Sequence, residues 1–317
     1  MCHNTAYHRI IIQCGHKEGV IPLKQTNFLI VDGSSMLVRA YFASAFQGRI
    51  MRSASGVYTN GVFGFLNMLL KAVEQMQPTH LFVAWDVSRD TFRRELYPAY
   101  KGTRGELPDE LHPQFDTTKE VLNALGVAQH LDERYEADDI IGTMARLAAE
   151  EKHDVLVLTG DRDALQLVHS NVTVAIMKKG ISEMGYYTPE SLMEEWGLSA
   201  SQITDLKGLM GDSSDNIPGI PGIGEKTAKK LLAEFETVEN LIANRHLLKG
   251  KMKDKVEEHQ EIALLSKRLA TIILDVPLTH ELEDCRLSFK MESAAEKLAD
   301  LGLHRFHTQL ERIVSAG

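Results

Sequence analysis

Short apolar runs recur along the chain and predict strands. They cover residues 28–31, 80–85, 155–158 and 172–176. Continuous apolar segments of this length are typical of strands buried on both faces of a parallel sheet. Between them apolar positions recur at helical spacing, in residues 62–76, 117–125 and 136–151. Strands that alternate with helices predict an α/β fold with a central, mostly parallel sheet flanked by helices.

Three of the apolar runs lead directly into aspartates. Asp32 follows the first run, Asp86 the second, and Asp161 with Asp163 the third. The carboxyl ends of parallel strands meet at one edge of a sheet, which is where open α/β sheets place their sites. We therefore expect these four carboxylates to lie near one another.

A second acidic cluster, Glu136, Asp138 and Asp139, opens the helix at 136–151. The helix macrodipole favours acids at this position, so the cluster by itself fits an ordinary helix start. Together with Asp161 and Asp163, however, the acids would repel one another strongly unless cations lay among them. Hard oxygen ligands suit Mg²⁺ or Mn²⁺. The pattern predicts a carboxylate metal site.

The composition sets broad limits on the class of protein. The chain has 317 residues, 44% of them hydrophobic and 25% charged, and a net charge of −9. That charge argues against a general nucleic-acid-coating protein, but bound cations would offset it in a metal-dependent enzyme. Three scattered cysteines indicate a reducing, cytoplasmic location, and no run is long enough for a membrane-spanning helix. Residues 1–26 lack the apolar core of a signal peptide, and we expect a disordered extension there.

The segment after Asp86 is basic. It contains Arg89, Arg93, Arg94, Lys101 and Arg104, with Tyr97 and Tyr100 between them. Such a run is most often a solvated helix face, but basic side chains interleaved with aromatics also suit a nucleic-acid backbone and its bases. Gly102, Gly105, Pro108 and Pro113 then punctuate the segment, which predicts a partly mobile element over the site.

Residues 219–224 read Gly-Ile-Pro-Gly-Ile-Gly and precede an amphipathic helix with Lys226, Lys229 and Lys230. Glycines let a backbone approach phosphate closely, and amides at a helix start bind it. This is the helix-hairpin-helix pattern, a sequence-independent grip on a DNA strand. Asp212 and Asp215, three residues apart, are predicted to join the metal site from one helical turn.

Taken together, these motifs resemble the 5′ nuclease (flap endonuclease) family, and most closely the 5′-nuclease domain attached to bacterial DNA polymerase I. The resemblance covers roughly residues 27 to 287 and rests on VDGSS at 31–35, WD at 85–86 with Arg93, YKG at 100–102 with Arg104, EADD at 136–139, TGDRD at 159–163 and GDSSDNIPGIPGIGEKTA at 211–228. Because the sequence continues only about thirty residues past the match, it looks like a stand-alone bacterial member.

The resemblance implies a PIN-like 5′-nuclease fold with a helical helix-hairpin-helix region. It divides the chain into an extension at 1–26, a nuclease α/β domain at 27–187, a DNA-binding domain at 188–287 and a helical tail at 288–317. Residues 93–115 would form an arch through or under which a 5′ strand passes.

The resemblance also implies roles for individual residues. One Mg²⁺ or Mn²⁺ would be surrounded by Asp32, Asp86, Glu136, Asp138 and Asp139, and a second by Asp161, Asp163, Asp212 and Asp215. Arg93 and Lys101 would contact the scissile phosphate, with Tyr100 stacked on a base and Arg39 near the entrance of the 5′ strand. Further DNA contacts would come from Arg104, Gly219, Gly222, Gly224, Lys226 and Lys229, and K⁺ would sit on the hairpin carbonyls. Val38 departs from the family, whose polymerase-linked members often have an aromatic residue there.

The implied function is a structure-selective 5′-3′ exonuclease or flap endonuclease that hydrolyses DNA and RNA-primer phosphodiesters by a two-metal mechanism. Its substrates would be DNA with a 5′ flap, nick or 5′ end, or an RNA/DNA hybrid, bound by a monomer during replication or repair. Two alternatives stay open: a PIN-type ribonuclease, and a catalytically silent protein that binds DNA structures.

Overall fold

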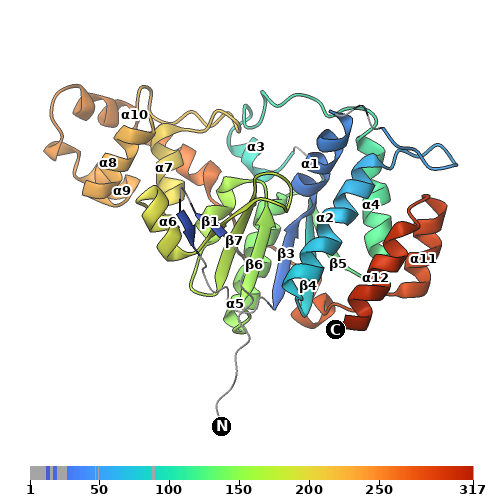
Figure 1. Ribbon diagram of the computed structural model, residues 1–317. Helices are drawn as coiled ribbons and strands as arrows, with labels where there is room; N and C mark the ends of the chain where they lie inside the picture. Colours follow the sequence, from blue (N-terminus) through green and yellow to red (C-terminus); the bar gives the residue numbers. More distant parts are fainter. Residues whose placement is uncertain are drawn as a thin grey trace, which may run out of the picture.

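A six-stranded sheet forms the centre of the computed structural model, which describes residues 12–14, 17–19, 27–46, 48, 50–87 and 90–316 (Figure 1). The strand order is β5-β4-β3-β6-β7-β8, and all neighbours are parallel except β7 and β8. The bounds are β3 Phe28–Asp32, β4 His80–Asp86, β5 Ala128–Asp132, β6 Val155–Thr159, β7 Val172–Met177 and β8 Met184–Tyr187.

The four predicted strands are confirmed as β3, β4, β6 and β7, and alternate residues of each strand pack on opposite faces of the sheet. In β3, Leu29 and Val31 join one apolar cluster, whereas Phe28 and Ile30 join the other. Both faces are therefore buried, which is why these strands read as continuous apolar runs. The mostly parallel α/β class is confirmed.

Helices cover both faces of the sheet. One face is packed by α1 (Gly33–Ala45), α2 (Asn60–Met76), α4 (His112–Leu125), α11 (Met291–Asp300) and α12 (Arg305–Ala316). The other face is packed by α5 (Ala137–Glu150). The short helix α3 (Phe92–Leu96) lies at the upper edge of the sheet in Figure 1.

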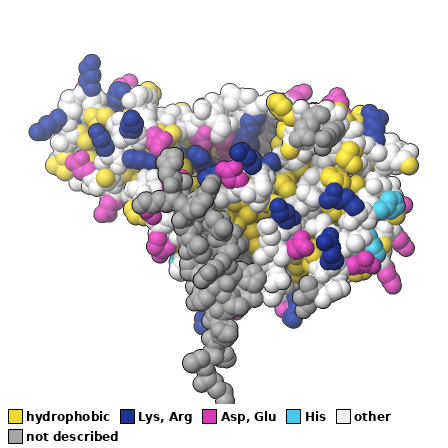
Figure 2. All heavy atoms as spheres, viewed as in Figure 1, with side chains coloured by type: hydrophobic (Ala, Val, Ile, Leu, Met, Phe, Trp, Pro, Cys, Tyr) yellow, Lys and Arg dark blue, Asp and Glu magenta, His cyan; other side chains and the backbone are white. Residues whose placement is uncertain are grey.

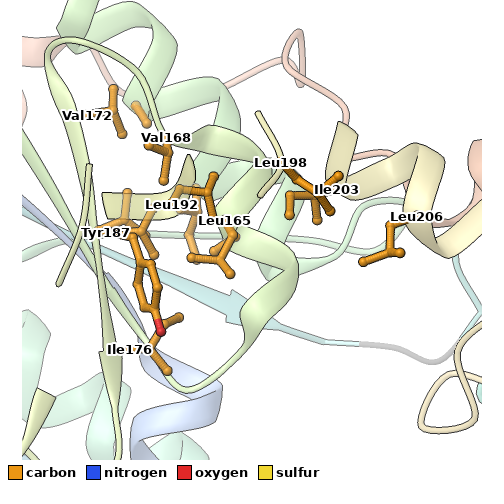
Figure 3. Close-up of a cluster of buried hydrophobic side chains, with 14 of the residues drawn as sticks. Leu165, Val168, Val172, Ile176, Tyr187, Leu192, Leu198, Ile203 and Leu206 are labelled. Atoms are coloured by element: carbon orange, nitrogen blue, oxygen red, sulfur yellow. The ribbon is translucent and has the colours of Figure 1, made fainter. Parts of the chain in front are cut away.

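The remaining helices form a lobe at the left of Figure 1. They are α6 (Pro189–Trp196), α7 (Gln202–Met210), α8 (Glu225–Phe235), α9 (Val238–Ala243) and α10 (Lys251–Ala270). Figure 3 shows how the lobe meets the sheet: Leu192, Leu198 and Ile203 lie beside side chains of β7, β8 and the 3₁₀ turn Arg162–Leu167, in one buried cluster. This shared core fixes the lobe to the sheet.

The chain then leaves the lobe and returns to the sheet. Residues 271–290 have irregular backbone apart from the short 3₁₀ helix Leu282–Cys285, and the amide of Leu287 donates to the carbonyl of Thr79. The tail at 288–317 packs through α11 and α12 onto α4 and α2. The predicted domain boundaries stay predictions.

Two short strands fall within residues 1–26. Ile12–Cys14 (β1) and Lys17–Gly19 (β2) pair antiparallel. The rest of that range lies outside the described residues, so the expectation of a disordered extension stays a prediction. Among the described residues, no helix has the length and apolar character needed to cross a bilayer.

Candidate active site

The strand order creates the site. The chain runs from β3 outward to β4 and β5, then returns to the other side of β3 as β6. Successive strands are thus added first on one side of β3 and then on the other. In α/β sheets a crevice opens at such a point, beyond the carboxyl ends of the strands. Asp32 ends β3, Asp86 ends β4, and Asp161 follows β6 by two residues. These three predicted residues are brought together.

A pocket of about 1310 Å³ lies at this edge. Figure 2 shows a hollow in the upper centre of the molecule, with acidic and basic side chains at its rim. Five predicted acids line the pocket: Asp32, Asp86, Glu136, Asp138 and Asp161. Its other walls carry basic groups, Arg39, Lys101, Arg104, Lys119 and Lys179, and apolar groups, Val38, Phe42, Phe46, Leu107 and Phe115.

Asp32 is buried, and each of its carboxylate oxygens accepts one hydrogen bond. It caps α1 by accepting from the amide of Ser35 at 2.8 Å, and it accepts from the hydroxyl of Thr159 at 2.7 Å. Burial and the negative charge of Asp86 nevertheless raise the pKa of the Asp32 carboxyl to about 7. The ionised Asp32 carboxylate therefore has too little positive charge near it to balance its own.

The neighbouring acids also have too little positive charge around them. Burial and the charges of Asp161 and Asp32 raise the pKa of Asp138 well above its ordinary value. Burial and Asp161 raise the pKa of Asp163 to about 7, despite a contact from Lys207. Clustered carboxylates with raised pKa values are the chemistry that a divalent cation relieves. The residues present therefore fit such an ion, although within the described part of the chain no three acidic, histidine or cysteine side chains are already drawn together as ligands.

The Asp32 carboxyl gives a pH prediction for the metal-free protein. Its pKa is higher when folded (about 7) than the ordinary 3.8, so folding favours the proton, and stability is lost as pH rises from about 4 to 7. We expect Asp32→Asn to gain stability relative to the unaltered protein across that window, by up to about 4 kcal/mol. Urea unfolding of both proteins in EDTA at several pH values measures the difference. A pH-independent difference would contradict the raised pKa.

Asp139 and Arg93 correct the sequence-based assignment. The two side chains form a bidentate ion pair with N–O distances of 2.6 and 2.7 Å, and they are only 0% and 2% exposed. Asp139 also accepts from the amides of Ile273 and Glu136. Asp139 is therefore saturated and does not face the pocket as a metal ligand.

The guanidinium of Arg93 makes further hydrogen bonds within the protein. Its remaining N–H groups donate to the carbonyls of Leu269 and Thr271, at 2.9 and 2.8 Å. The pair thus ties α3, α5 and the end of α10 together. One terminal nitrogen of Arg93 also lies 3.6 Å from a carboxylate oxygen of Glu136, which lines the pocket. The expected contact of Arg93 with a scissile phosphate stays a prediction.

Tyr100 is also buried, at 3% exposure, which corrects its expected role as a stacking platform. Its hydroxyl lies 3.1 Å from Glu136 and 3.2 Å from Asp215. Lys101, by contrast, lines the pocket with its Nζ 2.8 Å from Glu136. Arg104 also lines the pocket and donates to Asp215 at 2.5 Å. Lys101 and Arg104 keep positions from which they could reach a phosphate.

Asp212 and Asp215 lie in a turn rather than in the expected helical turn. Asp212 pairs with Ile217 across that turn through two backbone hydrogen bonds. Burial by itself would raise the pKa of the Asp212 carboxyl. The hydrogen bonds from Lys207 and Ser214 outweigh burial and lower this pKa to about 2. Asp212 is thus held ionised, and Asp215 is held by Tyr100 and Arg104.

Lys207 is the functional residue that sequence reasoning missed. Its Nζ contacts both Asp163 and Asp212, at 2.6 Å in the latter case, so it links two of the four acids predicted for the second metal group. Burial alone would lower the pKa of Lys207, but these two carboxylates raise it. The sequence feature that points to Lys207 is its place on helix α7, five residues before Asp212.

Replacing Lys207 by Gln is expected to destabilise the metal-free protein by about 2 to 4 kcal/mol, because two half-buried carboxylates lose their shared cation. Added Mg²⁺ should restore more stability to this variant than to the unaltered protein. Thermal unfolding with and without Mg²⁺ measures both effects. The control is Lys297→Gln, which removes an exposed pair with Glu120. Equal losses in the two variants would contradict the linking role.

The glycine hairpin lies between α7 and α8. Gly222 and Gly224 are exposed, and Gly224 is the N-cap of α8, as a phosphate-facing hairpin requires. Gly219 is buried, and its amide donates to the hydroxyl of Ser266 at 3.0 Å. Its positive φ of 62° and its contact with Gly211, where a Cβ would lie 2.2 Å from the backbone nitrogen, explain the glycine structurally. Gly219 therefore shapes the hairpin rather than facing DNA.

The predicted surface cations are distributed around these elements. Lys226 is exposed on α8, and Lys229 pairs with Glu225 at 2.9 Å. Arg39 lines the pocket and donates to the carbonyl of Lys178. Arg89 lies outside the described residues. The mobility and the 93–115 bounds of the expected arch stay predictions.

Two consecutive family models match residues 27–293 of the chain. Residues 27–197 match the 5′-3′ exonuclease N-terminal resolvase-like domain, and residues 198–293 match the 5′-3′ exonuclease C-terminal SAM fold. The second match begins near the start of α7, so it contains the glycine hairpin and the helical lobe from α7 to α10.

Curated relatives agree. The chain is 44% identical over 291 residues to a 5′-3′ exonuclease of Bacillus subtilis, which covers 92% of this chain and 98% of that protein. It is 46% identical over 287 residues to DNA polymerase I of Bacillus caldotenax, covering 89% of this chain and 32% of the polymerase. The chain thus spans about a third of the length of its polymerase I relatives.

Solved structures share the fold at low sequence identity. A T5 5′-exonuclease with bound zinc superposes with a TM-score of 0.64 at 19% identity, covering 91% of this chain and 98% of that one. Flap endonuclease-1 from Methanococcus jannaschii gives 0.63 at 15% identity, covering 98% and 97%. The fold, the two matched domains and the level of identity place this chain in the 5′-3′ exonuclease family.

Proposed function

We propose that this chain hydrolyses phosphodiester bonds of DNA near a 5′ end, nick or 5′ flap, by a mechanism that uses two divalent ions. The observation that carries this is the acid cluster at the carboxyl ends of β3, β4 and β6. Its buried carboxylates have raised pKa values and face a pocket that also holds Lys101 and Arg104. Negative groups that need cations, next to positive groups that suit phosphate, match this chemistry.

Two sets of acids are available for the ions. Asp32, Asp86, Glu136, Asp138 and Asp161 surround the pocket. Asp163 and Asp212 form the second group with Lys207 between them. Mg²⁺ or Mn²⁺ bound there would supply a water of lowered pKa and charge for the leaving oxygen. The T5 5′-exonuclease structures include complexes with zinc and with DNA and metal ions, which supports a metal and DNA role here.

The chain's own residues would bind and orient the substrate. Lys101, hydrogen-bonded to Glu136 at the pocket wall, would meet a phosphate that enters above the acids. Arg39 also lines the pocket and would meet the incoming strand. The exposed hairpin glycines and Lys226 would hold duplex DNA, with K⁺ on the hairpin carbonyls.

We also propose that the chain works as a monomer in the cytoplasm. The sequence has three cysteines, and Cys285 is buried as a free thiol whose pKa is raised to about 12 by burial. A thiol in this state is unreactive and fits a reducing compartment.

Cleavage of a 5′-labelled flap duplex in Mg²⁺ tests the proposal, with an EDTA control, a single-stranded oligomer and an RNA oligomer alongside. We expect metal-dependent cutting near the flap junction and little cutting of the single strand. Tight flap binding without cutting would favour the silent binding protein, and cutting of RNA alone would favour a PIN-type ribonuclease.

A further inference from the structure

Trp196 brings together two cations from distant parts of the chain. It is the last residue of α6 and is half-buried. The guanidinium carbon of Arg162, from the turn after β6, lies 5.6 Å from the centre of its ring. The Nζ of Lys229, from α8 beyond the glycine hairpin, lies 5.2 Å from the same centre. Both distances are in the range of cation–π contacts.

The ring is anchored to the sheet. Tyr187 is buried at the end of β8, and its hydroxyl donates to Glu195, the residue before Trp196, at 3.1 Å. Trp196 also packs against the apolar cluster that joins the lobe to the sheet. A ring fixed in this way gives the two cations a common contact.

The position of these cations connects the two proposed DNA-binding regions. Arg162 stands in sequence between Asp161, which lines the pocket, and Asp163. Its side chain is exposed, as are Lys226 and Lys230 on the same helix as Lys229. Figure 2 shows Lys and Arg side chains on the helical lobe and again towards the central hollow. Arg162 and Lys229 therefore lie between the edge of the acid pocket and the hairpin helix.

Two cations near one ring repel each other, and Lys229 also forms a half-exposed ion pair with Glu225. An anion bound close to both cations would relieve that repulsion. Each cation lies within 6 Å of the same ring centre, so both are within reach of neighbouring phosphates of one strand. The anion that such a pair of cations suits is the regularly spaced phosphate backbone of a nucleic acid.

We propose that Trp196 holds Arg162 and Lys229 as a phosphate clamp on duplex DNA, set between the hairpin and the acid pocket. This rests on the proposed nuclease function. Because the clamp adjoins both regions, it fixes the distance between the gripped duplex and the acids. Trp196 is thus a positioning residue, which affects DNA through the two cations.

The test measures the affinity for a labelled flap duplex by fluorescence anisotropy in EDTA, over a series of salt concentrations. The variants are Arg162→Gln, Lys229→Gln and Trp196→Leu, with Arg312→Gln, an exposed cation on α12, as the control. We expect each cation variant to bind about 5- to 10-fold more weakly and to lose about 0.9 from the salt slope for its lost phosphate. Trp196→Leu should lose affinity and slope although it removes no charge. Arg312→Gln should change neither.

Trp196→Leu is the decisive variant. An unchanged salt slope with a lower unfolding temperature would show that the ring only packs, and would overturn the clamp. If Trp196→Leu does not fold, the test uses the double variant that combines Arg162→Gln and Lys229→Gln. An unchanged salt slope in that double variant would also overturn the clamp. Failure of the unaltered protein to bind any duplex would instead reject the proposed function on which the clamp rests.

Discussion

Replacing Arg93 by Ala is expected to destabilise the protein by about 3 to 5 kcal/mol, because it leaves the buried Asp139 carboxylate without its partner. The replaced guanidinium also satisfies the carbonyls of Leu269 and Thr271, so two further buried acceptors lose donors. Urea unfolding in EDTA measures the loss. In the flap assay, any fall in cleavage should follow the unfolded fraction.

Arg94 provides the matched control one residue away. It is half-exposed and pairs with Asp90 on the surface of the same short helix. Arg94→Ala should change stability by less than about 1 kcal/mol. A fully stable Arg93→Ala variant with severely reduced cleavage would contradict the structural role of Arg93. It would restore the phosphate contact that the sequence predicts.

Replacing Asp138 by Asn is expected to reduce cleavage by at least about a thousandfold, because the loss of one metal-holding carboxylate removes several kcal/mol of transition-state stabilisation. Stability in EDTA should stay equal or rise, since the variant removes a charge from a cluster that repels it. Single-turnover cleavage of the flap duplex and urea unfolding measure the two effects on the same samples.

The adjacent Asp139→Asn makes the opposite prediction for stability. It removes the charge that Arg93 needs and should cost about 3 kcal/mol or more. If Asp139→Asn were as stable as the unaltered protein, the buried pair would not contribute as described. If Asp138→Asn kept substantial Mg²⁺-dependent turnover, the assignment of the acid cluster would be wrong.

The sequence predicts the central strands and the position of the acids well, for a clear physical reason. Strands buried on both faces must be apolar throughout, so β3, β4 and β6 stand out. The residues at their carboxyl ends must then meet at one edge. Asp32, Asp86 and Asp161 follow from that pattern without knowledge of any long-range contact.

The edge strands escaped prediction because they lack the pattern. β5 reads Ala-Gln-His-Leu-Asp and is only partly buried, and β8 has four residues. Their strand character comes from neighbours: β5 pairs with β4, and β8 with β7. Tertiary context decides such segments more than local preference does.

The pairing of charges is the part of the site that no local pattern encodes. Arg93 and Asp139 are 46 residues apart, and Lys207 and Asp163 are 44 apart. In the sequence Arg93 looks like its neighbour Arg94, and Asp139 looks like Asp138. Only the fold shows that Arg93 and Asp139 pair with each other in the interior. It leaves Arg94 in a surface pair with Asp90 and Asp138 at the wall of the pocket.

The most direct test of the central claim is a count of divalent ions bound by the DNA-free protein, made by titrating Mn²⁺ and measuring the free ion by electron paramagnetic resonance. The structure predicts saturable binding by the unaltered protein, weakened in Asp138→Asn and Asp32→Asn, and displaced by Mg²⁺. Absence of saturable binding at millimolar Mn²⁺, or equal binding by all three proteins, would contradict the claim that these acids form a metal-dependent nuclease site.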